Sequence, residues 1–296
     1  MQVLITGATG FVGHEIVKEL LIRGHEVRAL ARPGSQGKLE AAAQVEVFSG
    51  DVLDRDAMAR AAAGCDAVIH LVGIIREFPR RGITFERLHV EATEIVVDAA
   101  LAAGVPRFLH MSALGARPGP ADPYHTTNFQ AEAYVRASGL TYTIFRPSVI
   151  YGPGDQSINL FARQVKALPI FPVIGNGLYQ MQPVPVTAVA QAFALALKLP
   201  HTENRTYDMG GPEPMTFNDI IDTLAQVLGR KVYKLHLPVW PMRLAAGLLG
   251  RFPWFPVTKG QIRMLLEGNT CEPGPFYQDF GITSFSFQQG LAGYLT

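Results

Sequence analysis

Residues 2–13, QVLITGATGFVG, combine a strand, a glycine-rich turn and the beginning of a helix. The apolar run at residues 3–5 has the length and composition of a buried strand. The turn at residues 6–10 holds only small side chains, and from Phe11 onward apolar residues recur at helical spacing. Strand, glycine turn and helix in this order are the context that a dinucleotide-binding fingerprint requires.

Three glycines give this turn its predicted function. Gly7 permits the tight turn, Gly10 lets the backbone approach a pyrophosphate, and Gly13 lets the helix lie close to the sheet. The helix N-terminus adds free N–H groups and a partial positive charge. The spacing is Gly-x-x-Gly-x-x-Gly rather than Gly-x-Gly-x-x-Gly, so a glycine-rich turn without a ligand is the alternative. The predicted contacts are Gly7, Thr9, Gly10, Phe11 and Val12.

The composition describes an ordered globular protein. The chain has 296 residues, of which 48% are hydrophobic and 17% are charged. Its net charge of +1 argues against nucleic-acid binding. The two cysteines, Cys65 and Cys271, have neither a disulfide framework nor a metal-ligand spacing, so we assign no metal.

We expect a cytoplasmic protein. The sequence enters a strand at once, which leaves no room for a secretory signal. No apolar run approaches the roughly 20 residues that span a bilayer. Peripheral contact with a membrane or a larger complex stays open.

Strand and helix patterns alternate along the first half of the chain, which predicts a Rossmann-type doubly wound parallel sheet with a small interleaved C-terminal domain. We expect residues 1–155 in the dinucleotide-binding domain, with residues 186–210 returning to it. Residues 156–185 and 211–296 then form the small domain. Expected elements include a long helix at 85–103, a strand at 231–235 and, from residue 272, a loop that closes with a short helix.

Arg32 follows the second predicted strand, nineteen residues after Gly13. NAD-binding folds carry an acid near this place for the ribose 2′-hydroxyl, and none is nearby here. Because a guanidinium binds a 2′-phosphate bidentately, we predict NADP(H) rather than NAD(H). A solvated loop arginine is the alternative. At the end of the fourth predicted strand, Leu71, Val72 and Gly73 would let the backbone pass close under the cofactor.

Five segments carry a family resemblance. TGATGFVG (residues 6–13) resembles the nucleotide-binding turn of short-chain dehydrogenases/reductases. HLVGIIRE (70–77), TFERLHVEAT (84–93), FLHMSALGARP (108–118) and FRPSVIYGPGD (145–155) resemble an atypical, epimerase/dehydratase-like branch of that family. The branch includes the NADPH-binding accessory subunit of respiratory complex I and free-standing bacterial relatives. The match is specific to about residue 155 and looser afterwards. It implies tight nucleotide binding, often with a structural role.

The resemblance also implies the rest of the cofactor site. Asp51 would meet the adenine edge while Val52 packs on the ring. The turn after the sixth strand would pass the nicotinamide, and the tip of the fifth strand would lie beside it. The tip of the fifth strand holds Met111 and Ser112, and the turn holds Pro147, Ser148 and Val149. The resemblance also implies Tyr124, at the start of the helix after the fifth strand.

The implied catalytic group is a serine, a tyrosine and a lysine four residues after the tyrosine. Ser112 and Tyr124 match the first two, but the lysine position is Asn128. A phenol with a pKa near 10 is a poor base without a neighbouring cation, and loss of general acid–base catalysis costs roughly 10²- to 10⁴-fold in rate. His125 points to another helix face. Ser112 and Tyr124 can therefore be catalytic or purely structural.

The match at Ser112 and Tyr124 and the missing lysine at Asn128 leave two functions open. The first is an NADP(H)-binding accessory, structural or sensor protein with weak or no catalysis. The second is an active NADP(H)-dependent reductase, epimerase or dehydratase that acts on a small polar substrate. Asn128 is the feature that separates them.

Two basic segments lie outside this site. The loop at 74–84 holds Arg76, Arg80 and Arg81, either for an anionic ligand or as a solvated loop. Residues 237–259 hold Trp240 and Trp254 among basic residues. This stretch is either a lid that buries its aromatics or a surface for a protein partner or a membrane.

Overall fold

The computed structural model describes residues 1–39, 42–119, 122–250, 252, 255 and 257–295. The chain divides into two compact units. Unit 1 comprises residues 1–147, 187–208 and 274–282, and unit 2 comprises residues 148–186, 209–273 and 283–296. The first segment thus ends at residue 147, where the sequence suggested 155, and residues 274–282 belong to unit 1 rather than to the smaller domain.

Unit 1 is built on a seven-stranded sheet in the order β11-β6-β5-β4-β1-β2-β3. Every pairing from β3 across to β6 is parallel. The predicted doubly wound fold is therefore confirmed. The strands are β1 (Gln2–Thr6), β2 (Glu26–Ala31), β3 (Glu46–Ser49), β4 (Ala67–His70), β5 (Arg107–Met111), β6 (Thr141–Pro147) and β11 (Arg205–Met209).

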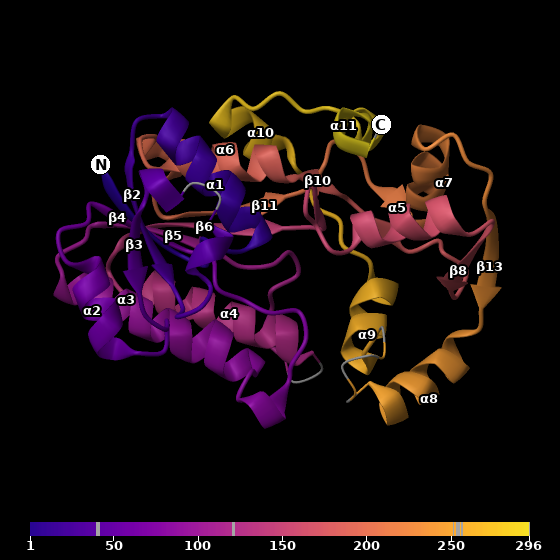
Figure 1. Ribbon diagram of the computed structural model, residues 1–296, viewed down its shortest axis with the longest axis horizontal. Helices are drawn as coiled ribbons and strands as arrows, with labels where there is room; N and C mark the ends of the chain where they lie inside the picture. Colours follow the sequence, from indigo (N-terminus) through magenta and orange to yellow (C-terminus); the bar gives the residue numbers. More distant parts are fainter. Residues whose placement is uncertain (40–41, 120–121, 251, 253–254, 256, 296) are drawn as a thin grey trace. The chain divides into compact units, whose positions relative to one another are not determined.

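Helices cover both faces of this sheet (Figure 1). Helices α2, α3 and α4 lie on one face, and α1, α6 and α10 lie on the other. Their bounds are α1 (Phe11–Ile22), α2 (Arg55–Ala62), α3 (Ala92–Ala102), α4 (Pro123–Ala137), α6 (Val186–Ala196) and α10 (Gly274–Phe280). The short helices are η1 (Gln36–Lys38), η2 (Ala42–Gln44), η3 (Pro79–Arg81), η4 (Glu86–Glu91) and η5 (Pro200–Thr202).

The core of unit 1 follows from strand alternation. Leu4 is level with Val68 in the sheet, and Val68 with Phe108, so all three side chains share one face. They are fully buried in the same cluster as Val96 of α3. Helix α2 begins at a side-chain cap, because the Asp54 side chain accepts the Ala57 N–H at its start.

The predicted single helix at 85–103 is a π-helix, η4, followed by α3. A π-turn shifts the direction of its side chains and is frequent at functional sites. Here His89 of η4 reaches the Ile74 backbone and Thr127 of α4. A regular helical pattern could not indicate this irregularity.

The C-terminal tail ends in a short helix as expected, α11 (Phe287–Leu295), but the stretch expected to be a loop also contains the helix α10. In α10, Phe276 and Phe280 stand one turn apart and are both buried in unit 1. The Phe280 ring lies 5.7 Å from that of Phe145 and 4.9 Å from that of Tyr207. Apolar residues four positions apart mark such a short helix despite its Gly- and Gln-rich surroundings.

Unit 2 has its own aromatic core around α5 (Ile158–Ala167), α7 (Phe217–Val227) and α11 (Phe287–Leu295). Phe217 is packed there against Phe161, Phe171 and Tyr179. Helix α7 starts with a capping box between Thr216 and Asp219. The other helices are α8 (Val239–Leu249) and α9 (Lys259–Glu267).

Three two-stranded sheets complete unit 2. They pair β7 (Ile150–Tyr151) with β10 (Val184–Pro185), β9 (Gln180–Met181) with β12 (Met215–Thr216), and β8 (Ile170–Ile174) with β13 (Tyr233–Leu237). The strand expected at 231–235 is thus displaced by two residues. No helix in the described part of the chain is long and apolar enough to cross a bilayer.

The close approach of α1 to the sheet requires a glycine at position 13. A Cβ there would meet the Gly7 carbonyl oxygen and would lie 2.7 Å from the Ala8 Cα. Both neighbours are backbone atoms, so neither can rotate away, and a side chain would push α1 off the turn.

We expect Gly13→Ala to lower the free energy of unfolding by roughly 1–3 kcal/mol, because the added methyl overpacks the turn. Gly37→Ala is the matched control, since a Cβ there has no atom within 4 Å. Urea unfolding of both variants measures the difference. Equal stability of the two variants would contradict the proposed contact.

Candidate dinucleotide site

The glycine turn presents open amides at the positive end of a helix. Gly7 adopts a φ of +83°, and the Gly10 N–H donates to the Gly7 carbonyl at 3.0 Å. Gly10 is the N-cap of α1 and has no side chain to cap the helix. Within the described chain, no backbone carbonyl or capping side chain accepts the N–H groups of Phe11, Val12 and Gly13. Such amides form an anion site that suits a pyrophosphate.

The end of β4 lies directly against this turn. The Leu71 N–H donates to the Thr6 carbonyl at 3.1 Å, and a Cβ on Gly7 would lie 3.2 Å from the Leu71 Cβ. Val72 is half-buried and Gly73 is exposed. The structure therefore brings Leu71 together with the glycine turn, and the donor set fits a dinucleotide at the carboxyl edge of the sheet.

Two predicted residues stand after the neighbouring strands. Arg32 directly follows β2, is exposed, and forms no side-chain hydrogen bond or ion pair among the described residues. Asp51 follows β3, and its Oδ1 accepts the Leu53 N–H at 2.9 Å. Val52 is buried in the core. Arg32 is thus available to a ligand, whereas part of the Asp51 carboxylate stabilises its own turn.

The Ser112 hydroxyl is directed at a buried carboxylate. It donates to Glu132 Oε1 at 2.5 Å. Arg146 donates to both oxygens of Glu132 at 2.6 and 2.5 Å, and Arg136 donates to Oε2 at 2.7 Å. Burial disfavours the charged form of Glu132, but hydrogen bonds from Arg146, Ser112 and Arg136 together lower its pKa. A serine proton held by this carboxylate is not available to polarise a carbonyl.

Tyr124 lies among aromatic rings rather than cations. Its ring makes edge contacts with Phe85, His89 and His125 at centroid distances of 5.7, 5.6 and 5.3 Å. Burial, with a smaller effect of the Asp122 charge, raises the pKa of Tyr124 to about 12. The environment thus opposes formation of tyrosinate instead of favouring it.

Asn128, at the position of the family lysine, is buried and bonded within its own unit. Its Nδ2 donates to the Tyr124 carbonyl at 2.8 Å and lies 3.3 Å from His89 Nδ1. His89 also contacts Thr127 Oγ1 at 2.9 Å, and burial lowers the pKa of His89 to about 4. The imidazole that contacts Asn128 is therefore neutral at pH 7 and does not replace the missing ammonium group.

Sequence reasoning missed Glu132 and His89. Asn128, Glu132 and Arg136 follow one another at four-residue spacing, so the sequence indicates that they share one helix face. The other partners of Glu132, Ser112 and Arg146, come from outside this helix. His89 lies inside an apolar helical pattern. Only its unusual burial, 4% exposed, distinguishes it.

Two further histidines lie in the sheet beside these groups. His70 of β4 is level with His110 of β5, and their rings stack with centroids 5.5 Å apart. His70 Nδ1 contacts Thr6 Oγ1 at 2.7 Å, while both ring nitrogens of His110 lack a hydrogen-bond partner among the described residues. Burial lowers the pKa of His110 to about 4 and that of His70 well below its usual value.

The remaining predicted contacts fall into two groups. Met111 is half-buried at the end of β5, and Pro147 ends β6, where its carbonyl accepts the Leu114 N–H at 3.0 Å. Ser148 and Val149 belong to unit 2, where Ser148 Oγ donates to the Asn269 carbonyl at 3.1 Å. Their nicotinamide contacts stay predictions.

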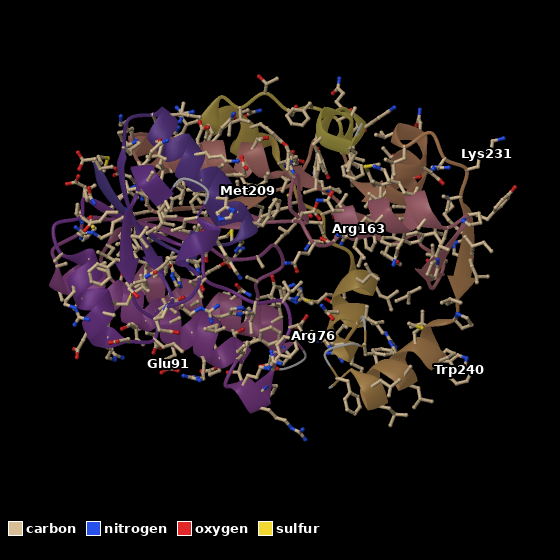
Figure 2. The ribbon with its side chains drawn as sticks, viewed as in Figure 1. Arg76, Glu91, Arg163, Met209, Lys231 and Trp240 are labelled. Atoms are coloured by element: carbon tan, nitrogen blue, oxygen red, sulfur yellow. The ribbon has the colours of Figure 1, made fainter. Side chains whose placement is uncertain are left out.

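The predicted basic loop is ordered around an aromatic ring. The Arg76 and Arg81 guanidinium groups lie 5.4 and 5.9 Å from the centre of the Phe78 ring. Figure 2 shows Arg76 on this loop after β4. The Arg80 side chain is exposed.

A doubly wound sheet whose glycine turn offers open amides defines a protein that binds a nicotinamide dinucleotide. The chain belongs to the NAD(P)H-binding family, whose model matches residues 7–166. It is 26% identical over 295 residues to the mitochondrial NADH-ubiquinone oxidoreductase 40 kDa subunit of Neurospora crassa, covering 94% of this chain and 74% of the relative. The resemblance to the complex I accessory-subunit branch is thereby confirmed.

Two further similarities extend this placement. Ceramide reductase of Caulobacter vibrioides is 31% identical over 252 residues, which cover 83% of this chain and 76% of the relative. The structure of MoeE5 in complex with UDP-glucose and NAD matches with a TM-score of 0.78 at 20% identity, over 99% of this chain and 96% of that one. The similarity to the MoeE5 structure supports the fold.

The buried histidines make stability depend on pH. Because their pKa is lowered on folding, the unfolded chain binds more protons between about pH 4 and 6.5, and stability falls as the pH falls through that range. For His110 alone we expect a loss of about 2 kcal/mol between pH 7 and pH 5. His110→Phe should reduce this pH dependence in urea unfolding by that amount.

The exposed His236 provides the control, since His236→Gln should leave the pH dependence as it is. An unchanged slope in His110→Phe would show that folding does not shift the pKa of His110.

Proposed function

We propose that this protein is an NADP(H)-binding atypical short-chain reductase with an accessory, structural or sensor role and weak or no catalysis. The observation that carries the proposal is the state of the three implied catalytic positions. The Ser112 proton is held by Glu132, the pKa of Tyr124 is raised, and Asn128 brings no charge.

The groups that would bind the nucleotide match its pyrophosphate and its planar rings in chemistry. Open amides at Phe11 and Val12 suit the pyrophosphate, and the apolar end of β4 at Leu71 lets the cofactor approach. When bound, NADP(H) supplies a transferable hydride. At a free concentration of 1,000 times its dissociation constant, NADP(H) would also add about 4 kcal/mol to the free energy of unfolding. This gain suits a protein in which the nucleotide has a structural role.

Arg32 is proposed to select NADP(H) over NAD(H) through the 2′-phosphate. Hydrogen bonds to charged groups contribute roughly 1.5–3 kcal/mol. Arg32→Asp should therefore reduce the preference for NADPH over NADH by about 10- to 100-fold in calorimetric titrations. Arg60→Asp, an exposed arginine of α2, is the control. An unchanged preference in Arg32→Asp would remove this residue from the site.

Asn128→Lys tests the lack of catalysis. A lysine there would place an ammonium group near Tyr124, lower the pKa of its phenol and favour proton transfer. We expect the native protein to bind NADPH without oxidising it in a screen of carbonyl substrates, and Asn128→Lys to gain measurable oxidation. Asn128→Met matches the length without the charge and should stay inactive.

The second candidate is an active NADP(H)-dependent reductase, epimerase or dehydratase. The observation that favours it is the 31% identity to a ceramide reductase, which by its name reduces a ceramide. Turnover by the native protein that Tyr124→Phe abolishes would establish this candidate and overturn the accessory role.

An accessory protein needs a surface for the structure that it serves. We propose that the protein is cytoplasmic and peripheral to a membrane, and that residues 237–259 meet a protein partner or a membrane surface. In this segment Trp240 is 72% exposed, which does not support the lid interpretation, whereas Trp254 lies outside the described residues.

A further inference from the structure

Residues 230–266, which include α8 and all of α9 except its last residue Glu267, carry positive charge only. Residues 230–266 contain no Asp or Glu, although 25 acidic residues in a chain of 296 correspond to about three in 37. The same span contains seven basic residues: Arg230, Lys231, Lys234, Arg243, Arg251, Lys259 and Arg263. Of these, Lys234 pairs with Asp222 in α7. A nearly neutral chain thus concentrates positive charge in one part of unit 2.

Helix α8 presents an apolar stripe within this region. Trp240, Leu244 and Leu248 stand four residues apart and are 72%, 58% and 64% exposed. This spacing places them on one face. Ala246 on another face is buried, and Val239 packs near Gly175. Helix α8 is therefore anchored to unit 2 on one side and leaves large apolar groups uncovered on the other (Figure 2).

Basic side chains flank the stripe. Arg243 directly precedes Leu244 and is exposed. The Lys259 side chain lies along Gly247, because a Cβ on Gly247 would be 3.5 Å from the Lys259 Cε. An aliphatic stem beside apolar residues with its ammonium group outward is typical of a lysine at a membrane interface.

We propose that the face formed by Trp240, Leu244, Leu248, Arg243 and Lys259 docks on a lipid bilayer that contains anionic phospholipid. The stripe would enter the boundary between headgroups and acyl chains, where tryptophan is favoured. The basic groups would meet the headgroups. A helix that combines a Trp and Leu stripe with flanking basic groups has the composition of an interfacial helix on anionic lipid. This docking rests on the peripheral role proposed above for residues 237–259, and it does not depend on nucleotide binding.

Vesicle co-sedimentation of the full chain tests the proposal. We expect binding to phosphatidylcholine vesicles with about one-third phosphatidylglycerol and little binding to phosphatidylcholine alone. Each basic residue near such a surface adds about fivefold, so Arg243→Gln with Lys259→Gln should weaken binding roughly 25-fold. Leu244→Ser with Leu248→Ser should weaken it more than tenfold, because the apolar anchor is lost.

Matched variants in unit 1 distinguish binding through this face from nonspecific adsorption of the protein to vesicles. Ile22 is 80% exposed, and Ile22→Ser with Arg60→Gln removes one apolar group and one charge elsewhere. This control should bind vesicles as the native protein does. NADPH titration of every variant shows that the fold persists, and it separates failure of docking from failure of nucleotide binding.

Three outcomes would overturn the proposal: no binding to anionic vesicles, equal binding to neutral vesicles, or stripe variants that bind as the native protein does. The first would leave a protein partner as the occupant of this face.

Discussion

The absence of a side chain at Gly13 is the constraint on which the site depends. Because α1 starts against the backbone of Gly7 and Ala8, its first amides lie at the turn instead of behind a layer of side chains. The same turn packs on Leu71, which joins β1, α1 and the end of β4 in one rigid unit. An anion can meet those amides only where no Cβ intervenes, so nucleotide binding is a property of backbone packing here.

A second constraint acts at the other end of the site. Glu132 has no exposed surface, yet it accepts hydrogen bonds from Ser112, Arg136 and Arg146. Removing one partner would leave a buried charge less compensated, so the group stabilises the junction of β5, β6 and α4 as a whole. A residue expected to serve catalysis thereby serves the connection between strands. The hydrogen bonds of Glu132 are consistent with the proposal that this scaffold keeps its cofactor site with weak or no catalysis.

The sequence predicts the regular part of this structure well. The glycine turn, the alternation of strands and helices and the caps at Asp54 and Thr216 follow from local patterns, because each depends on neighbours within a few residues. The hydrogen bonds of Glu132 connect residues from Ser112 to Arg146, so local sequence patterns could not predict them. The π-helix around His89 and the buried faces of α10 were missed for the same reason, since tertiary contacts decide them.

The course of the chain has a consequence for biosynthesis. Unit 1 takes its final segment from residues 274–282, after the chain has built most of unit 2. Phe276 and Phe280 then complete the aromatic cluster around Phe145 and Tyr207. A nascent chain that has left the ribosome only to residue 208 therefore still lacks part of this core. The nucleotide domain is therefore completed only after residues 209–273 of unit 2 have been synthesised, although domains more often fold in N- to C-terminal order.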